Sequence, residues 1–353
     1  MTGSLVVPPG IAPVVLPADV PPQVRRRLAE SGTLLPPFTD AHVHLGLVDP
    51  APLRARGVAA VHDLGGVPAD VAALSTSTAD DPALPRVAYA GAFLTAPGGY
   101  PSDRPWAPAG SVEEVGDPAA AAAAVDRQVA AGASFVKVAL HATAGPVPDD
   151  ATLAAVVGRA HEHGRPVVAH AEGPGQAARA FEAGVDRLAH APFSERLPDE
   201  LLASTAAGGV TGRPMTWIST LDIHGWGAPT TEHEVALENL GRFVAAGGRV
   251  RYGTDLGNGP LPVGLNHREL AALAAAGLGR RSLLVALVGD EPPTGLVSFV
   301  PGPAPARADD GAVHAAWLAR ATVLDVAALR DPAFVPPTDA PQTLEEPHDH
   351  HAP

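Results

Sequence analysis

Five side chains suited to metal binding stand at the ends of short apolar runs. The motif FTDAHVH carries His42 and His44, while His170, His190 and Asp255 end the runs PVVAH, VDRLAH and RVRYGTD. Residues two apart on a β-strand point to the same face, so His42 and His44 can reach a single ion. Imidazole nitrogens and carboxylate oxygens are ligands suited to Zn²⁺ and similar ions. These residue types indicate a metal centre, provided that the fold brings the strand ends together.

A sixth candidate is Lys137, which lies in the apolar run SFVKV and is the single lysine of a chain with 23 arginines. Burial disfavours an ammonium and lowers its pKa, whereas arginine does not deprotonate. A neutral buried amine can add carbon dioxide to give a carbamate, which is in effect a carboxylate able to bridge two cations. The alternative is a lysine whose ammonium reaches the rim of the fold or pairs with an acid. The histidines nearby favour the carbamate.

The elements that must position these side chains alternate along the chain. Most of the strand candidates are continuous apolar runs, which is typical of strands buried on both faces of a parallel sheet. We expect strands at residues 38–44, 58–64, 86–94, 134–138, 166–170, 185–190, 213–219 and 249–255. Between them lie helical patterns, such as the alanine-rich segment 117–132 and the apolar three-and-four spacings of 149–164 and 232–247.

Eight strand–helix repeats over residues 38–278 predict a (β/α)8 TIM barrel. A doubly wound open sheet is the alternative, but no GxGxxG turn follows the first strand. In a barrel the C-terminal ends of all strands surround one mouth, where the reacting groups gather. The six candidates should therefore converge there.

The remaining segments are less regular. Residues 1–37 and 279–335 contain the strand-like stretches LVVPPGIAPVVL, GLVSFVP and ATVLDVA, which predict a reduced β-structure beside the barrel. The long Gly- and Pro-rich connection 95–116 is typical of a lid or binding loop. Residues 336–353 are polar, proline-rich and rich in histidine, and we expect a disordered tail.

Composition excludes several classes of protein. The chain has no cysteine, so disulfides and thiolate catalysis are excluded, and its net charge of -14 argues against binding nucleic acid. Without a long apolar run or a signal peptide we expect no membrane association and a cytoplasmic location. A small-molecule substrate is the expected partner, and a homo-oligomer is compatible with the sequence.

Taken together, the motifs HVH after FTDA, FVKV, VVAHAEG, GVDRLAHA and YGTD resemble the strand motifs of the amidohydrolase superfamily. They are most similar to its binuclear branch with a bridging carboxylated lysine, which includes Xaa-Pro dipeptidases and imidazolonepropionase-like hydrolases. RGVAAVHDLGG and TAPGGYP resemble the second strand and the third-strand loop of that branch. The likeness covers residues 38–278. The chain departs from the pattern in having only 37 residues before Phe38, which implies a reduced flanking domain.

This resemblance implies a role for each of the candidate residues. His42, His44 and Asp255 would hold one divalent ion and His170 and His190 a second, both most often Zn²⁺, with carboxylated Lys137 as the bridge. A water between the two cations would become hydroxide and attack a carbonyl, with Asp255 as general acid–base. The implied reaction is hydrolysis of a C–N bond in an amide, dipeptide or cyclic amide.

Other functions also fit the sequence. Glu172 in HAEG suggests a mononuclear deaminase, and a lactone or ester hydrolase or a non-catalytic metal-binding barrel are further alternatives. Tyr100, Arg213 and His224 lie near predicted strand-end loops, where we expect substrate contacts, with a substrate carboxylate at Arg213. His141, four residues past Lys137, is compatible with a site contact or with a core position.

Overall fold

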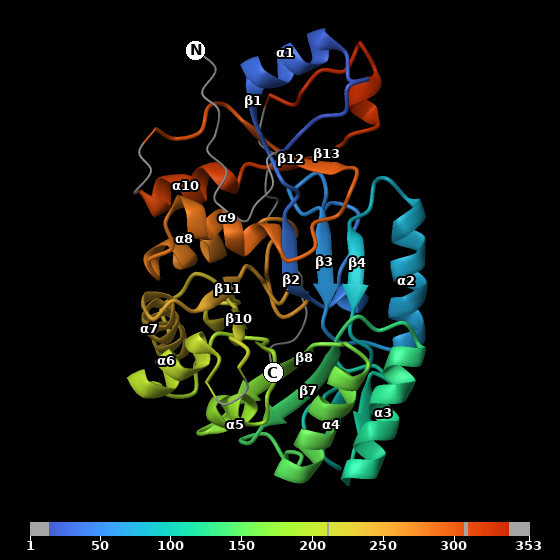
Figure 1. The fold of residues 1–353 in the computed structure, drawn as a ribbon, viewed down its shortest axis with the longest axis vertical. Helices are drawn as coiled ribbons and strands as arrows, with labels where there is room; N and C mark the ends of the chain where they lie inside the picture. The colour runs from blue at the N-terminus through green and yellow to red at the C-terminus, as the bar shows by residue number, and fades with distance from the viewer. Residues whose placement is uncertain (1–13, 210–211, 307–309, 339–353) are drawn as a thin grey trace.

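A computed structural model describes residues 14–209, 212–306 and 310–338 of the protein (Figure 1). From residue 339 on, the predicted tail lies outside the described residues, as does the start of LVVPPGIAPVVL up to residue 13.

Parallel strands form the centre of the molecule. One sheet has the order β2-β3-β4 and a second the order β11-β10-β9-β8-β7-β5-β6. Their bounds are β2 (Thr39–Val43), β3 (Ala60–Asp63), β4 (Arg86–Tyr89), β5 (Phe93–Thr95), β6 (Val112–Glu114), β7 (Val136–His141), β8 (Val167–Glu172), β9 (Arg187–Leu188), β10 (Thr216–Ile218) and β11 (Arg249–Arg251).

Isolated parallel bridges join the two sheets at both of their common edges. One bridge pairs Val43 with Leu256, beside β2 and β11, and the other pairs Ala90 with Phe135, beside β4 and β7. Strands β2, β3, β4, β7, β8, β9, β10 and β11 therefore follow one another around a ring. The TIM-barrel fold expected from the strand pattern is confirmed.

The third predicted strand, 86–94, is divided in the structure. Its first part, β4, pairs with β3, and its second part, β5, pairs with β7 and with the short additional strand β6. The side chain of Gln128 causes the break, because its Oε1 accepts a hydrogen bond from the backbone N–H of Ala92 at 3.0 Å. Gly91 makes this approach possible, since a Cβ there would lie 1.3 Å from the same Oε1.

Helices surround the strands (Figure 1). They are α2 (Pro68–Asp80), α3 (Pro118–Ala130), α4 (Asp150–Glu162), α5 (Gln176–Glu182), α6 (Asp199–Ala207), α7 (Thr231–Ala245), α8 (His267–Ala275), α9 (Arg280–Val288) and α10 (Gly311–Leu318). Side chains fix several starts: Asp117 and Asp149 accept from the backbone N–H groups of Ala120 and Thr152, which the first turn leaves unpaired. Among the described residues, no helix has the length and apolar character needed to cross a membrane.

The repeat is less regular than eight strand–helix units. Between β2 and β3 the chain forms only the 3-10 helix η1 (Leu45–Leu47) and turns, and the segment 49–57 contains two prolines, Pro50 and Pro52. At the other end, α9 lies beyond residue 278 and packs against β11 and β2. Its buried leucines Leu283, Leu284 and Leu287 cover the point where the last barrel strand meets the first.

Two layers of apolar side chains hold the barrel. The larger cluster fills the space between strands and helices. A smaller one takes one residue from each of seven strands or their continuations. Its members are Ala41, Leu64, Ala90, Phe135, Val168, Ala189 and Ile218.

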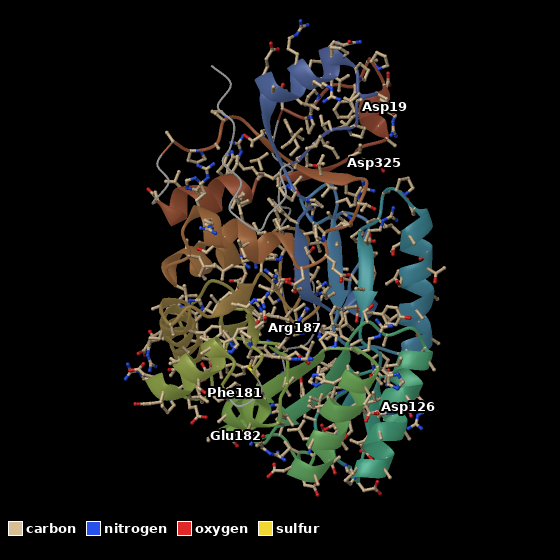
Figure 2. The ribbon with its side chains drawn as sticks, viewed as in Figure 1. Asp19, Asp126, Phe181, Glu182, Arg187 and Asp325 are labelled. Carbon is tan, nitrogen blue, oxygen red and sulfur yellow. The ribbon has the colours of Figure 1, made fainter. Side chains whose placement is uncertain are left out.

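The expected flanking β-structure is present, built from both ends of the described chain. An antiparallel sheet has the order β1 (Gly32–Leu35), β12 (Leu296–Pro301), β13 (Thr322–Asp325), and α1 (Pro22–Ser31) packs on it through Val24 and Leu28. Figure 2 labels Asp325 at this end of the molecule, where it lies 3.9 Å from Arg54 of the barrel. The strand β1 and the helix α1 carry no clear apolar alternation, and the sequence did not predict them.

The contact between β10 and α7 yields a stability prediction. The rings of Trp217 and Phe243 are buried and stacked, with centroids 3.9 Å apart. Phe243→Ala should lower the free energy of unfolding by about 3–5 kcal/mol, because it removes apolar area and leaves a cavity. Urea unfolding measures this loss. Val313→Ala, at a position 48% exposed on α10, is the control and should change stability little.

Candidate functional site

The ends of β2 and β11 bring three predicted ligands to one point. Nε2 of His42 and Nε2 of His44 lie 3.0 and 3.2 Å from Oδ1 of Asp255, and 3.3 Å from each other. The backbone N–H of Asp255 donates to the carbonyl of His42 at 2.8 Å, which holds the two chain segments in register. Asp255 has a φ of 59°, a strained value for a non-glycine residue and one that recurs at functional sites.

The two histidines are oriented by backbone carbonyls. Nδ1 of His42 donates to the carbonyl of Ala189 at 2.9 Å, and Nδ1 of His44 donates to that of Gly65 at 3.0 Å. In the neutral imidazoles each Nε2 then carries a lone pair. Oδ1 of Asp255 is buried and accepts no hydrogen bond. When both imidazoles are neutral, three electron-pair donors thus face one another, which is the arrangement a metal cation fits.

The electrostatics of this cluster favour a positive charge at the same point. Burial alone would raise the pKa of Asp255, but the neighbouring imidazoles of His42 and His44 hold that pKa well below its usual range. Burial lowers the pKa of His42 well below its usual value, so this imidazole is neutral. For His44 the neighbouring carboxylate outweighs burial and raises the pKa. The carboxylate therefore attracts a cation, whether a proton or a metal ion.

His190 joins this cluster. Its ring centroid lies 4.9 Å from that of His42, and potential ligand atoms of His42, His190 and Asp255 all lie within 4.8 Å of one another. Burial lowers the pKa of His190 well below its usual value. Its Nδ1 lies 2.9 Å from the hydroxyl of Thr220, which leaves Nε2 for a ligand.

Lys137 is buried on β7, with 2% of its surface exposed. Burial lowers its pKa to about 8, although the charges of Asp255 and Asp63 oppose the change. The neutral amine is therefore on the order of 10²-fold more abundant at neutral pH than in an ordinary lysine. The charge of Lys137 in turn lowers the pKa values of His42, His44 and His190.

His170 belongs to a second, adjoining cluster with His141 and Glu172. Nε2 of His170 donates to Oε2 of Glu172 at 3.0 Å, and Nε2 of His141 lies 3.2 Å from the same oxygen. Since β7 and β8 are paired with His141 opposite Glu172, the strand register itself makes this contact. The rings of His170 and His190 lie 4.8 Å apart, so the two clusters touch. The sequence could have indicated that His141 faces the site, because Lys137 and His141 are four residues apart on β7 and therefore share one face of that strand.

Of the three predicted substrate contacts, two lie beside the clusters. Tyr100 stacks on His170 with ring centroids 5.3 Å apart. His224 lies 4.3 Å from Phe193, whose ring is 6.3 Å from that of His190. Burial, and then the charge of His233, lower the pKa of His224 to about 4.

The structure does not bring Arg213 to the site. Its side chain is 70% exposed, and its Nη1 lies 3.9 Å from Oδ1 of Asp186. Both residues precede their strands, β10 and β9, and so lie at the end of the barrel opposite the histidines. The expectation was wrong because Arg213 begins the predicted strand 213–219, and the start of a strand lies at the opposite end of a parallel barrel from the strand ends that carry the histidines.

Buried carboxylates hold the loops that carry the site. Asp40 accepts from the backbone N–H groups of His42 and Thr254, and burial raises its pKa to about 7. Asp63 accepts from the N–H groups of Leu45 and Gly65 and so fixes the loops on either side of His44. No sequence motif indicated a role for Asp40 or Asp63.

Comparison with sequences finds no relative, since no protein-family model and no curated protein matches the chain. Comparison with solved structures finds hydrolases. An Xaa-Pro dipeptidase with methionine bound in its active site has a TM-score of 0.61 and 18% identity, over 82% of this chain and 84% of that one. Molinate hydrolase has a TM-score of 0.60 and 15% identity, over 83% and 82%. Bottromycin amidohydrolase has a TM-score of 0.56 and 20% identity, over 84% and 78%.

These similarities show that the chain shares the fold of these three hydrolases. The resemblance expected from the strand motifs is confirmed at this level. All three identities are low, so the likeness concerns the fold, and the chemistry has to be argued from the side chains above.

The loop that carries His224 yields a pH prediction. Glu269 on α8 accepts from the backbone N–H of Asp222 at 2.8 Å, and burial raises its pKa from 4.5 to about 7. Because the folded protein keeps this proton up to a higher pH than the unfolded chain, the stabilisation is full at low pH and is lost as the pH rises towards 7.

Glu269→Gln should remove this dependence. Between pH 5 and pH 8 the wild-type protein should lose more unfolding free energy than the variant, measured by urea unfolding. Parallel pH profiles of the two proteins would show that Glu269 titrates normally.

Proposed function

We propose that this protein is a metal-dependent hydrolase that cleaves a C–N bond in an amide, a dipeptide or a cyclic amide. One observation carries the proposal: Nε2 of His42, Nε2 of His44 and the unpaired Oδ1 of Asp255 converge beside a buried lysine. The fold is that of enzymes named for the hydrolysis of such bonds, which supports the same reaction class. The loops around the barrel mouth, and not the fold, determine which substrate binds.

The candidate ligands fit two divalent ions. His42, His44 and Asp255 would hold one, and His170 and His190 a second, with Lys137 as a carbamate between them. Zn²⁺ suits this set of nitrogen and oxygen ligands. Bound ions of this kind lower the pKa of water to near neutrality and polarise a carbonyl group. The contact between the His170 and His190 rings, at 4.8 Å, supports a shared second site.

The protein's own residues supply orientation and proton transfer. Oδ1 of Asp255 faces the two imidazoles as a candidate metal ligand. Proton transfer with the attacking water would therefore fall to Oδ2, which the amide of Asn258 orients by donating to it at 2.9 Å. The same residue can then deliver the proton to the leaving nitrogen as a general acid. Tyr100 and His224 flank the clusters and are positioned to bind the rest of the substrate.

A mononuclear deaminase is the second candidate, and the position of Glu172 favours it. This carboxylate lies 3.0 Å from His170 and 3.2 Å from His141, where it could transfer protons to a substrate amine. Metal analysis separates the candidates, because the hydrolase should bind two ions per chain and the deaminase one. Assays with N-acyl amino acids, Xaa-Pro dipeptides, cyclic amides, lactones and aminated heterocycles test the reaction class directly.

The role of Asp255 gives the first functional prediction. Asp255→Asn should keep the fold and lower kcat by about 10²–10⁴-fold, because an amide cannot accept the proton. Turnover and metal content should be measured together on the best substrate of the panel. Asp325→Asn on β13 is the control and should retain normal turnover. A metal-loaded Asp255→Asn enzyme with near-normal kcat would exclude Asp255 as the base.

The carbamate gives the sharpest prediction. Lys137→Arg should bind metal poorly and be inactive, because a guanidinium cannot form a carbamate and keeps its positive charge. Lys137→Ala should also be inactive, but it leaves a cavity beside the ligands. Added formate or acetate should partly restore both metal binding and activity in Lys137→Ala, since these small acids supply the missing oxygens.

Metal content and turnover of both variants, with and without the acid, provide the measurement. A structural lysine would predict no rescue and would tolerate arginine. An active Lys137→Arg protein would therefore discard the bridging role and favour the mononuclear candidate.

A further inference from the structure

A pocket of about 150 Å³ opens directly beside His44. It lies among the loop after β2, the loop after β3, the start of α2 and the loop that follows β5. Its walls are mostly apolar and include Leu47, Val67, Val71, Leu74, Phe93 and Trp106. None of these side chains has a part in the chemistry proposed above.

Two apolar side chains at this pocket are exposed. Leu47 is 42% exposed and Trp106 is 39% exposed, although both belong to residue types that normally bury most of their surface. Exposed apolar side chains that surround a concave site are typical of a place where a ligand covers them.

The pocket and the candidate metal ligand His44 share a wall. The carbonyl of Gly65 accepts from Nδ1 of His44 at 3.0 Å, and the ring of Phe93 lies 5.6 Å from the His44 ring. Gly65 allows Phe93 to pack against the backbone here, since a Cβ at residue 65 would lie 2.4 Å from that ring. A group inside the pocket therefore lies within one side-chain length of the reacting centre.

The volume of the pocket and the charge of its lining limit which chemical groups can bind in it. A cavity of about 150 Å³ lined by apolar side chains accommodates a benzene-sized molecule. Asp70 also lines this pocket, and its carboxylate would repel an anionic group. The occupant that fits is a neutral branched aliphatic or aromatic group.

We propose that this pocket binds an apolar substituent of the substrate, of isobutyl to phenyl size, attached close to the carbonyl that is attacked. The assignment rests on the proposed hydrolase function and specifies its substrate class. Trp106 connects the pocket to the second cluster, because its ring lies 6.1 Å from that of Phe93 and 6.1 Å from that of Tyr100. Tyr100 in turn stacks on His170.

The first experiment measures binding without turnover. The purified protein is titrated by calorimetry with acetate, 3-methylbutanoate, phenylacetate and succinate. Complete burial of a leucine- or phenylalanine-sized group should make 3-methylbutanoate and phenylacetate bind about 10- to 150-fold more tightly than acetate. Succinate should gain nothing over acetate, because its second carboxylate would meet Asp70.

Variants assign the effect to the pocket. Leu47→Ala and Trp106→Ala, both at exposed positions, should reduce the preference for the larger acids at least about threefold, with the affinity for acetate unchanged. Val313→Ala, at a position 48% exposed and far along the chain on α10, is the matched control and should keep the full preference.

Kinetics complete the test. With dipeptides that carry glycine, leucine, phenylalanine or glutamate on each side of the bond in turn, kcat/KM should rise about 10- to 150-fold from glycine to leucine or phenylalanine at one of the two positions. Equal binding of all four acids would overturn the pocket assignment, whatever the enzyme hydrolyses. A clear preference for the larger acids without any turnover would instead uphold the pocket and reject the proposed hydrolase.

Discussion

A buried carboxylate oxygen without a hydrogen-bond donor is the constraint on which the site depends. Oδ1 of Asp255 is enclosed by imidazole nitrogens whose own protons are directed to backbone carbonyls. A buried negative charge is costly unless it is paired. The surrounding pKa values all respond to it, since the carboxylate raises the pKa of His44 and opposes the lowering of that of Lys137. A positive charge next to Oδ1 compensates the buried negative charge and so stabilises the whole cluster.

The barrel provides this arrangement through its strand ends. The ligand candidates come from five separate strands, and only a ring of parallel strands brings five C-terminal ends to one mouth. The orienting groups come from the same places: Gly65 and Ala189 follow β3 and β9 and offer their carbonyls to His44 and His42. Because strands, ligands and orienting carbonyls share one rigid scaffold, the imidazoles are held before any ligand arrives.

The sequence predicted what depends on local pattern and on strand ends. The barrel and its strand positions followed from apolar runs, and His42, His44, His190 and Asp255 do lie together because each ends such a run. What depends on register was not predicted: the pairing of His141 with Glu172 requires knowing which residues of β7 and β8 are opposite. Arg213 was misplaced because it stands at the start of its strand, whereas only the C-terminal ends of the parallel strands meet at the mouth of the barrel. The flanking strand β1 was missed because its pairing with β12 is long-range and leaves little local pattern.

The hydrogen bond from Asp255 to the carbonyl of His42 has a consequence for how the protein is made. It closes the barrel between its last and first strands, more than two hundred residues apart in the chain. During synthesis this edge of β2 therefore stays unpaired until the final barrel strand has emerged. Forming contacts between such distant parts of a chain is slow. An ion bound by His42 on one side of this junction and by Asp255 on the other would stabilise the closed ring and not the open one. Maturation of the fold and loading of the site would then be a single late event, and the first place to open in the metal-free protein would be the junction itself.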